Sequence, residues 1–272
     1  MSPSAELAYD VGMNNGDDTA YYLHKGCRVV AIEANPQLIG PARARFASDI
    51  AAGRLTILNV GVTDVAGEAD FFLSTKNDVW GSFDSGIAGR GGGFETVRVP
   101  CRPFAEILGE FGMPRYLKID IEGNDRLCLH ALGPDRRPAY ISIEMCHLAG
   151  DGDIKRLRDI GYGRFKCVRQ NDFELITPGN LDAQIARRRA KARGGFVVGA
   201  ARMWRRATRF TRHSRDGAWV FPSGSSGRLG PDLPGEWISA DETLGIWKRL
   251  RDIDAELVNR RAGEWFDIHA TA

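Results

Sequence analysis

The sequence has no run of about eighteen apolar residues, which is the length that a membrane-spanning helix needs. Its first residues, Met1 to Ser4, lead almost directly into an apolar strand-like run and leave no room for a secretory signal peptide. These two absences argue against a membrane-spanning or a secreted chain. We therefore expect a cytoplasmic protein.

Cysteine is scarce, and its placement is irregular. The chain of 272 residues has five cysteines, namely Cys27, Cys101, Cys128, Cys146 and Cys167. Their odd number, wide spacing and mostly apolar neighbours argue against a disulfide framework and against a zinc site. We expect reduced thiols in the core.

Acidic residues are missing from one long segment. Between Arg187 and Arg215 there are eleven Lys or Arg residues and no Asp or Glu, and subtracting these eleven from the net charge of +2 leaves −9. Within it, Val197 to Arg212 fit a basic amphipathic helix. Three roles stay open: a solvated helix, a receptor for an anionic acceptor, or a surface for peripheral contact with anionic lipid or RNA. The acidic remainder argues against nucleic acid as a partner.

Up to about residue 178, strand-like and helix-like patterns alternate. Strand-like runs occupy 28–34, 55–62, 116–121, 139–145 and 164–169. Helix-like runs occupy 17–25, 36–52, 103–111, 124–132 and 152–160. This alternation predicts an α/β fold, in which a mostly parallel sheet has helices on both faces and binds ligands at the carboxyl ends of its strands.

Between Glu68 and Cys101 the alternation lapses into a strand-like run, Asp70 to Leu73, and a glycine-rich stretch that predicts a long loop. Such a loop is either a lid over the substrate or a segment without a role. After residue 180 the pattern changes again, and a closing helix begins at Ser239, where Ser-Ala-Asp-Glu forms a capping box. Its expected apolar face consists of Leu244, Trp247, Leu250, Ile253 and Leu257.

The loop after the first strand, Ala8 to Val11, lacks the first glycine of a phosphate-binding loop. It has the form Asp-x-Gly-x-x-x-Gly, and its acidic side chains would repel a pyrophosphate. The second strand ends in Glu33, where a carboxylate can hold both hydroxyls of a ribose. S-adenosylmethionine fits this site, because it has a ribose and positive charge but no phosphate. A plain tight turn and an NAD-dependent oxidoreductase stay open as alternatives.

A second segment, Tyr116 to Asp125, is a strand with charged residues alternating along it. Lys118, Asp120 and Glu122 would rarely occupy a buried parallel strand without a purpose. Asp120 is therefore expected in the cleft beside the methyl donor.

Four motifs together resemble the FkbM-type family of S-adenosylmethionine-dependent methyltransferases. They are Asp-Val-Gly-x-Asn-x-Gly, Ile-Glu-Ala-Asn-Pro, Asn-Val-Gly-Val and Leu-Lys-Ile-Asp-Ile-Glu-Gly, within residues 8 to 147. The resemblance implies a class I Rossmann-like methyltransferase with a mostly parallel seven-stranded sheet. It also implies O-methylation of a sugar, glycoconjugate or other secondary metabolite. We assign residues 1–180 to the donor-binding domain and 181–272 to a basic extension that packs on or over the acceptor site.

The predicted donor-binding residues are Asp10, Gly12, Asn14, Asn15, Gly16, Asp18, Thr19, Glu33, Ala34, Asn35, Asn59 and Asp120. Methyl transfer mostly needs alignment of the reactants, and a base helps when the nucleophile is a hydroxyl. The predicted catalytic residues are Asp120, Glu122 and His147, with Asp120 preferred. A lone histidine such as His147 is also often structural.

A Mg²⁺ ion bound by Asp120, Glu122, Glu144 and His147 is a further option, but the spacing does not require it, and we assign no metal ligand. The expected partner is a small acceptor that is anionic or glycosylated. A noncatalytic binding or scaffold protein stays open as a third function.

Overall fold

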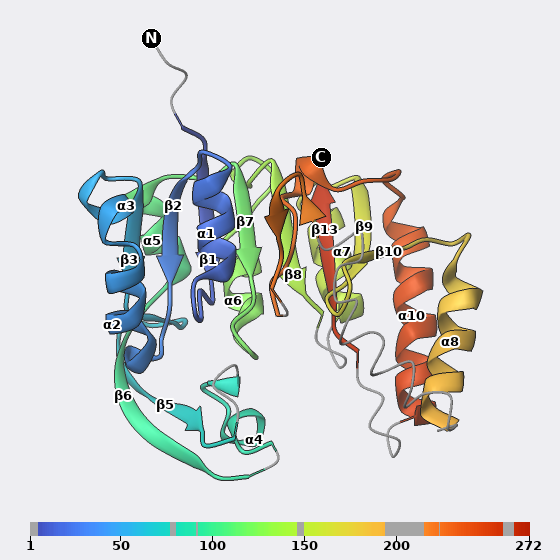
Figure 1. Ribbon diagram of the computed structural model, residues 1–272, viewed down its shortest axis with the longest axis horizontal. Coiled ribbons are helices and arrows are strands. Elements are labelled where there is room, and N and C mark those ends of the chain that lie inside the picture. The colour runs from blue at the N-terminus through green and yellow to red at the C-terminus, as the bar shows by residue number, and fades with distance from the viewer. Residues whose placement is uncertain are drawn as a thin grey trace. The chain divides into compact units, whose positions relative to one another are not determined.

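The computed structural model describes residues 5–76, 80–90, 92–145, 150–193, 215–222, 224–257 and 264–272 (Figure 1). The chain divides into two compact units, Met1–Ile143 and Glu144–Ala272, which are called the first and the second unit below. The predicted boundary near residue 180 stays a prediction. Among the residues described, no helix is both long and apolar enough to span a bilayer.

The strands that form the main sheet of the first unit run parallel to one another. Their order is β3 (Leu55–Leu58), β2 (Arg28–Ile32), β1 (Leu7–Val11), β7 (Tyr116–Ile119) and β8 (Tyr140–Glu144). The three central strands are almost completely buried, as expected for strands covered by helices on both faces. The predicted α/β fold with a mostly parallel sheet is confirmed.

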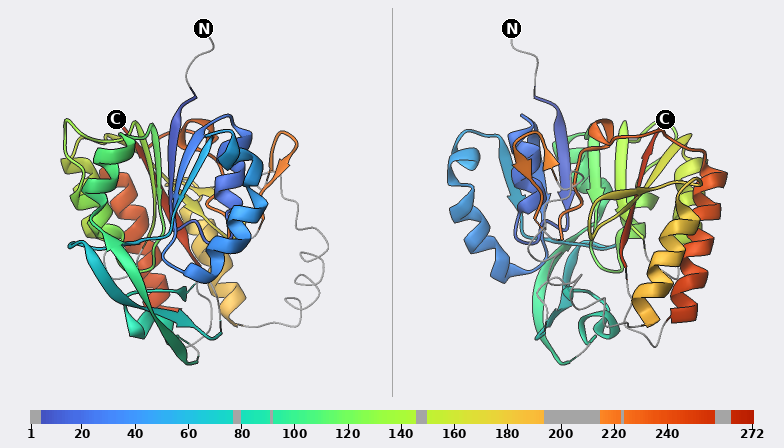
Figure 2. Two further views of the ribbon diagram at one scale, coloured as in Figure 1. Left: turned by 90° about the vertical axis from the view of Figure 1, so that its left-hand side faces the viewer. Right: turned by 45° about the vertical axis from the view of Figure 1, so that its right-hand side comes forward.

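Helices cover both faces of these strands. They are α1 (Asp17–His24), α2 (Pro36–Arg45), α3 (Ala47–Ala51), α5 (Phe104–Phe111) and α6 (Asp125–His130). Figure 2 shows α1 and α2 on one face and the green helices α5 and α6 on the other. The helix predicted over 36–52 is interrupted at Phe46, whose backbone leaves the helical conformation.

The strand-like run Asp70 to Leu73 is confirmed as part of a β-hairpin, whereas much of the remaining segment, predicted as a long loop, forms the second strand of that hairpin, which corrects the expectation. β5 (Gly67–Ser74) pairs antiparallel with β6 (Phe94–Arg102), and β6 also pairs with the short β4 (Gly61–Val62). The period-two alternation of apolar residues in β6 identifies a half-buried strand, but the adjacent glycines obscured it. Helix α4 (Ser85–Ala88) lies between the two strands in sequence, and Figure 1 shows it with the hairpin below the carboxyl ends of β1 and β7.

The second unit is built around β9 (Arg164–Arg169). This strand pairs antiparallel with β10 (Glu174–Ile176) and with β13 (Phe266–Thr271), the last strand of the chain. These two pairings place the strands of the second unit in the order β10, β9 and β13. A separate pair consists of β11 (Arg215–Asp216) and β12 (Trp219–Val220), and a short 3-10 helix spans Gly230–Asp232.

The described residues of the second unit also include the helices α7 (Gly150–Asp159), α8 (Leu181–Arg193) and α10 (Ala240–Leu257). Helix α10 packs against α7, α8 and β9. Its predicted capping box is confirmed, because Glu242 Oε2 accepts from the Ser239 N–H at 2.8 Å and the Glu242 N–H donates to Ser239 Oγ at 3.2 Å. The predicted apolar face is buried at Trp247, Leu250, Ile253 and Leu257 and half-buried at Leu244.

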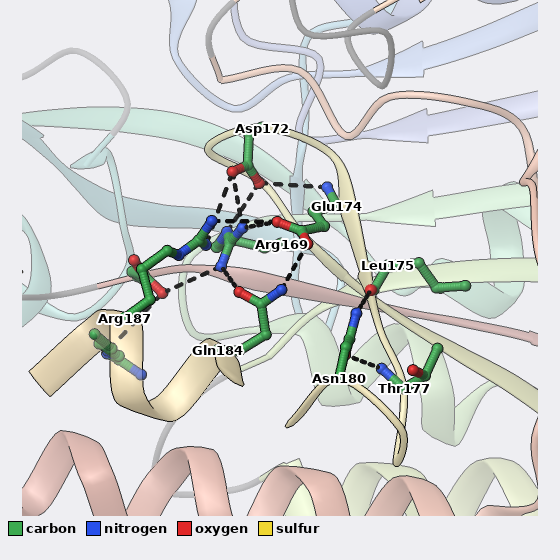
Figure 3. Close-up of polar contacts among 10 residues, drawn as sticks. Arg169, Asp172, Glu174, Leu175, Thr177, Asn180, Gln184 and Arg187 are labelled. Carbon is green, nitrogen blue, oxygen red and sulfur yellow. Dashed lines mark hydrogen bonds and ion pairs between the residues drawn. The ribbon is translucent and has the colours of Figure 1, made fainter. Parts of the chain in front are cut away.

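A buried arginine ties β9 to β10 and α8 (Figure 3). Arg169 donates to both carboxylate oxygens of Asp172 at 2.8 Å, to Glu174 at 2.5 Å and to Gln184 Oε1 at 2.8 Å. Arg187 of α8 lies 3.3 Å from the same Glu174. Arg169 is almost fully buried, so its guanidinium group loses its contacts with water on folding. These bonds compensate for that loss.

Three arginines at the start of the basic segment are paired with acids. Besides Arg187, Arg188 pairs with Asp254, and Arg189 pairs with Glu256 at 2.7 Å. These ion pairs connect α8 to β10 and α10 within the second unit. The helix predicted over Val197 to Arg212 lies outside the described residues, as does Cys146. The other cysteines, Cys27, Cys101, Cys128 and Cys167, are buried free thiols, as predicted.

Candidate active site

Three strands of the first unit end at one level, which brings the residues after them together. Val11 lies opposite Ile32 of β2 and opposite Ile119 of β7. The N–H of Gly12 donates to the Ile32 carbonyl at 2.9 Å, and the N–H of Asp120 donates to the Val11 carbonyl at 2.9 Å. The predicted strand-end residues Gly12, Glu33 and Asp120 therefore share one edge of the sheet.

Two glycines allow the first loop to pack closely. Gly12 has φ +86°, and a Cβ atom there would lie 1.7 Å from the Asp120 carbonyl oxygen. Gly16 has φ +81°, and its Cβ would lie 2.6 Å from the ring of Phe46. Because an L side chain would be strained at both angles and would collide at both positions, the loop requires glycine there.

Glu33 is held at the end of β2 by two backbone donors. Its Oε2 accepts from the Asn14 N–H and its Oε1 accepts from the Asn35 N–H, each at 2.8 Å. The residue is 8% exposed, and burial raises the pKa of Glu33 above its ordinary value although both donors oppose the shift. Each oxygen keeps a further lone pair, so the carboxylate can still accept from two hydroxyl groups.

Two predicted asparagines shape the loop. Asn14 has φ +50°, and its Oδ1 accepts from the Asn15 N–H at 2.6 Å. The exposed Asn15 accepts from the Asp17 N–H at 3.0 Å, and its carbonyl accepts from Arg45 at 2.8 Å. These bonds fix the backbone in which the Asn14 N–H points to Glu33.

Two further amides surround the end of β2. Asn59 donates to the carbonyls of Glu33 at 2.9 Å and Ala34 at 3.2 Å. Asn35 caps α2, because its Oδ1 accepts from the Gln37 N–H at 2.9 Å. Both predicted residues thus hold the backbone around the Glu33 carboxylate, and their direct contact with a donor stays a prediction.

A buried lysine lies at the centre of the acidic residues. Lys118 Nζ donates to the Gly12 carbonyl at 2.7 Å and lies 3.2 Å from Asp10, 3.8 Å from Asp120 and 3.9 Å from Asp18. Burial by itself lowers the pKa of Lys118, but the three carboxylates outweigh it and raise the pKa above its ordinary value. Lys118 is therefore charged at neutral pH and binds the loop to the end of β7.

The predicted donor residues Asp10, Asp18 and Thr19 lie beneath the loop. Thr19 Oγ1 donates to Asp10 Oδ2 at 2.6 Å, and all three side chains are buried. In this position they hold α1 against β1. The sequence shows the charge of Lys118 but does not predict a role for this residue. The signal that identifies it as important is a charged residue in a fully buried parallel strand.

Glu122 has a strained backbone and a perturbed carboxyl group. Its φ is +49°, its carbonyl accepts from Ser82 Oγ at 2.6 Å, and its Oε2 lies 3.6 Å from Arg90 Nη1. Burial, and then the neighbouring Asp120 and Asp125 charges, raise the pKa of Glu122 to about 7, while Arg90 opposes the shift. A carboxyl with this pKa can exchange a proton near neutrality.

The turn around Glu122 is fixed from two directions. The carboxylate of Asp125 accepts from the Ile121 N–H at 3.0 Å and from the Gly123 N–H at 3.1 Å. Asn124 donates to the carbonyl of Val62 in β4 at 2.9 Å. Ser82 and Arg90, which the sequence did not identify, come from the segment between β5 and β6, and no local pattern linked them to Glu122.

Not all predicted residues can be placed at the site. His147 lies outside the described residues, and Glu144 belongs to the second unit. Among the residues that the structure describes, no group of three or more His, Cys, Asp or Glu is arranged to hold a metal ion. The optional Mg²⁺ site therefore has no support.

Comparison with known protein families finds one family model that matches more than half of the chain. Residues 10–173 match the model described as "Methyltransferase FkbM domain". No curated protein matches the chain.

The solved structures to which the chain is similar include three methyltransferases from different organisms. Precorrin-6y C5,15-methyltransferase of Geobacter metallireducens is 15% identical, with a TM-score of 0.37 and coverage of 63% of this chain and 73% of the other. The Burkholderia thailandensis 1,6-didemethyltoxoflavin-N1-methyltransferase is 16% identical, with a TM-score of 0.33 and coverage of 61% and 64%. Haemonchus contortus phosphoethanolamine N-methyltransferase 2 is 9% identical, with a TM-score of 0.34 and coverage of 100% and 49%.

Proposed function

The chain belongs to the FkbM methyltransferase family, and from this premise we propose that it transfers a methyl group from S-adenosylmethionine to a hydroxyl group. The acceptor is a small molecule, namely a sugar, a glycoconjugate or another secondary metabolite. The observation that carries the proposal is the Glu33 carboxylate, which two backbone N–H groups hold at the end of β2.

The charges around the first loop support a donor with positive charge. Three carboxylates, those of Asp10, Asp18 and Asp120, surround the single ammonium group of Lys118. The site therefore has excess negative charge, which attracts a sulfonium and repels a phosphate. Glu33 would bind the ribose, and Gly12 and Gly16 would let the loop backbone approach the donor. These residues fit S-adenosylmethionine better than NAD.

Glu122, rather than the Asp120 that the sequence favours, is the base that we propose for a hydroxyl acceptor. In the transfer, the acceptor oxygen forms a bond to the methyl carbon, the sulfur–carbon bond breaks, and its electron pair stays on sulfur. The hydroxyl proton then goes to a carboxylate, and a pKa of about 7 suits Glu122 to take it. Asp120, between Glu122 and Lys118 in sequence, would orient the reactants. His147 stays a candidate base.

Isothermal titration of the full chain tests donor binding. We expect S-adenosylmethionine and S-adenosylhomocysteine to bind with micromolar affinity and NAD not to bind. Glu33→Ala should weaken donor binding more than about tenfold, which corresponds to about 1.4 kcal/mol. The matched control is Glu95→Ala, an exposed glutamate of β6, and should bind as the wild type does. Binding of NAD alone would overturn the proposal.

The atom that receives the methyl group needs a separate test. The protein is incubated with a donor labelled with ¹³C in its methyl group and with a panel of sugars and hydroxylated metabolites. Methyl carbons on oxygen, nitrogen and carbon have distinct chemical shifts. An O-methyl signal is expected, and an N-methyl or C-methyl signal would contradict O-methylation while leaving methyl transfer intact.

A further inference from the structure

Arg90 is a half-exposed cation beside the proposed base. It follows α4, and its side chain is 49% exposed, whereas that of Glu122 is 17% exposed. Their closest atoms lie 3.6 Å apart, which is an ion pair but too long for a hydrogen bond. Within the described part of the chain, Glu122 is the one acid that pairs with Arg90. Most of the five guanidinium donors of Arg90 therefore stay available.

The two arginines of the following strand β6 are paired differently. Arg98 of β6 lies 3.3 Å from Asp70 and 3.9 Å from Glu68 of the neighbouring strand. Arg102 donates to Glu110 at 2.8 Å. These pairs lie among exposed or half-exposed residues. Arg90 differs because its partner is the carboxyl group that we assign as the base.

The segment after β5 fixes both the backbone and the charge of Glu122. Ser82 Oγ donates to the Glu122 carbonyl at 2.6 Å and accepts from the Asp84 N–H at 3.0 Å. The left-handed conformation is unfavourable for a non-glycine residue, so surrounding contacts must impose it. The same segment also supplies Arg90 to the Glu122 carboxylate. The segment therefore contacts Glu122 both at its carbonyl oxygen and at its carboxylate.

We propose that Arg90 binds an anionic group of the acceptor, a carboxylate or a phosphate, and that this contact releases the Glu122 carboxylate for the hydroxyl to be methylated. This inference rests on the proposed function, because it concerns the same base. Carboxylate and phosphate bind guanidinium through two parallel hydrogen bonds, which are stronger than the long contact with Glu122. An anionic acceptor thus competes for Arg90, whereas a neutral acceptor leaves it on Glu122.

The exchange changes the charges around the base in a defined direction. The charged groups that face Glu122 are Asp120 at the end of β7, Asp125 at the start of α6 and Arg90. When an anion draws Arg90 away, Glu122 loses its one opposing positive charge. Its pKa then rises, and the carboxylate becomes a stronger base towards the hydroxyl proton.

The titration of Glu122 by ¹³C NMR tests the inference in the full chain labelled at its glutamate carboxyl carbons. Glu122→Gln identifies the signal. The probes are inorganic phosphate and acetate, each exchanged against chloride at constant ionic strength. We expect at least one probe to raise the Glu122 midpoint by about half a pH unit. In Arg90→Gln the midpoint is already raised and does not respond. Arg98→Gln is the matched control and should respond like the wild type.

The outcomes separate the two possible sources of the anion. A response to phosphate alone indicates a phosphorylated acceptor, and a response to acetate indicates a carboxylated one. If neither probe moves the midpoint, or if Arg90→Gln responds as the wild type does, the inference is wrong. Donor binding, measured by titration with S-adenosylmethionine, is independent of this result. Failure of donor binding would instead remove the proposed function itself.

Discussion

The Nζ atom of Lys118 lies 3.2 Å from Oδ1 of Asp10, and both side chains are buried. The two residues also lie directly opposite each other in the parallel pairing of β7 with β1. The same ammonium group donates to the carbonyl of Gly12, the first glycine of the loop. One lysine thus links the pairing of two central strands to the geometry of the candidate donor site.

Lys118→Met should destabilise the protein strongly. The substitution leaves the Asp10 carboxylate buried without its opposite charge, and breaking one side of a buried ion pair costs about 3–5 kcal/mol. The free energy of unfolding, measured by urea titration with circular dichroism, should fall by this amount. Lys155→Met, at an exposed position of α7, is the control and should change it little.

The double variant Asp10→Asn with Lys118→Met distinguishes charge from shape. With both charges removed, no uncompensated ion is left, so the loss should be smaller than the sum of the two single losses. Strict additivity of the two single losses would show that the ion pair itself does not account for the stability of this region.

Gly12→Ala should abolish donor binding and lower stability. A Cβ at this position would lie 1.7 Å from the Asp120 carbonyl oxygen and would require φ near +86°, so the loop must move away from β7. Gly26→Ala is a matched control, because Gly26 has φ +84° but no atom within 4 Å of its Cβ position. The control should lose about 1 kcal/mol and keep donor binding. Equal effects in both variants would mean that the backbone angle alone matters.

The rate of methyl transfer should increase with pH around neutrality. Glu122 accepts a proton only when ionised, so kcat/KM should rise to a plateau above the Glu122 pKa of about 7. Glu122→Gln should lower kcat by about 10²- to 10⁴-fold and remove this limb of the profile. A profile that keeps its midpoint in Glu122→Gln would assign the base to Asp120 or His147.

His269 should make the protein sensitive to acid. Its ring is fully buried, neither ring nitrogen has a hydrogen-bond partner among the described residues, and burial followed by the charge of Lys166 lowers its pKa to about 3. Between pH 6.5 and 3 the unfolded chain binds a proton that the folded chain does not. The stability contribution is thus complete above pH 6.5 and is lost as the pH falls towards 3.

In His269→Leu, the free energy of unfolding should fall less steeply between pH 6.5 and pH 3. The difference from the wild type should amount to a few kcal/mol. His130→Asn, an exposed histidine of α6, serves as the control and should leave the curve unchanged. The measurement is the free energy of unfolding by urea at a series of pH values. An unaltered acid limb in His269→Leu would show that other groups cause the acid sensitivity.

Local sequence patterns were enough to find the strand ends of the candidate site. Glu33 and Asp120 each end an apolar run, and parallel strands in register must bring such residues to one edge. The contact of Ser82 with Glu122 could not be found in this way, because 40 residues separate them. The hairpin that carries Ser82 was mistaken for a loop because glycines adjoin β6.

The C-terminal strand was also beyond local patterns. β13 is short and follows α10, yet it pairs with β9, which lies about a hundred residues earlier in the chain. The sequence placed it in an extension that packs on the acceptor site. Nothing in Phe266 to Thr271 alone indicates which strand it joins, since the pairing depends on the arrangement of the second unit.

Ile268→Ala should therefore destabilise the protein although Ile268 lies only four residues before Ala272. Ile268 is fully buried opposite Cys167 of β9, and truncating such a side chain costs about 2–5 kcal/mol. Trp265→Ala, at a 40% exposed position beside the strand, is the control and should cost less. Urea unfolding measures both.

A deletion after residue 180 would remove β13 altogether, so we expect it to unfold the second unit. If that deletion stayed folded, β13 would contribute little and Ile268→Ala should be nearly neutral.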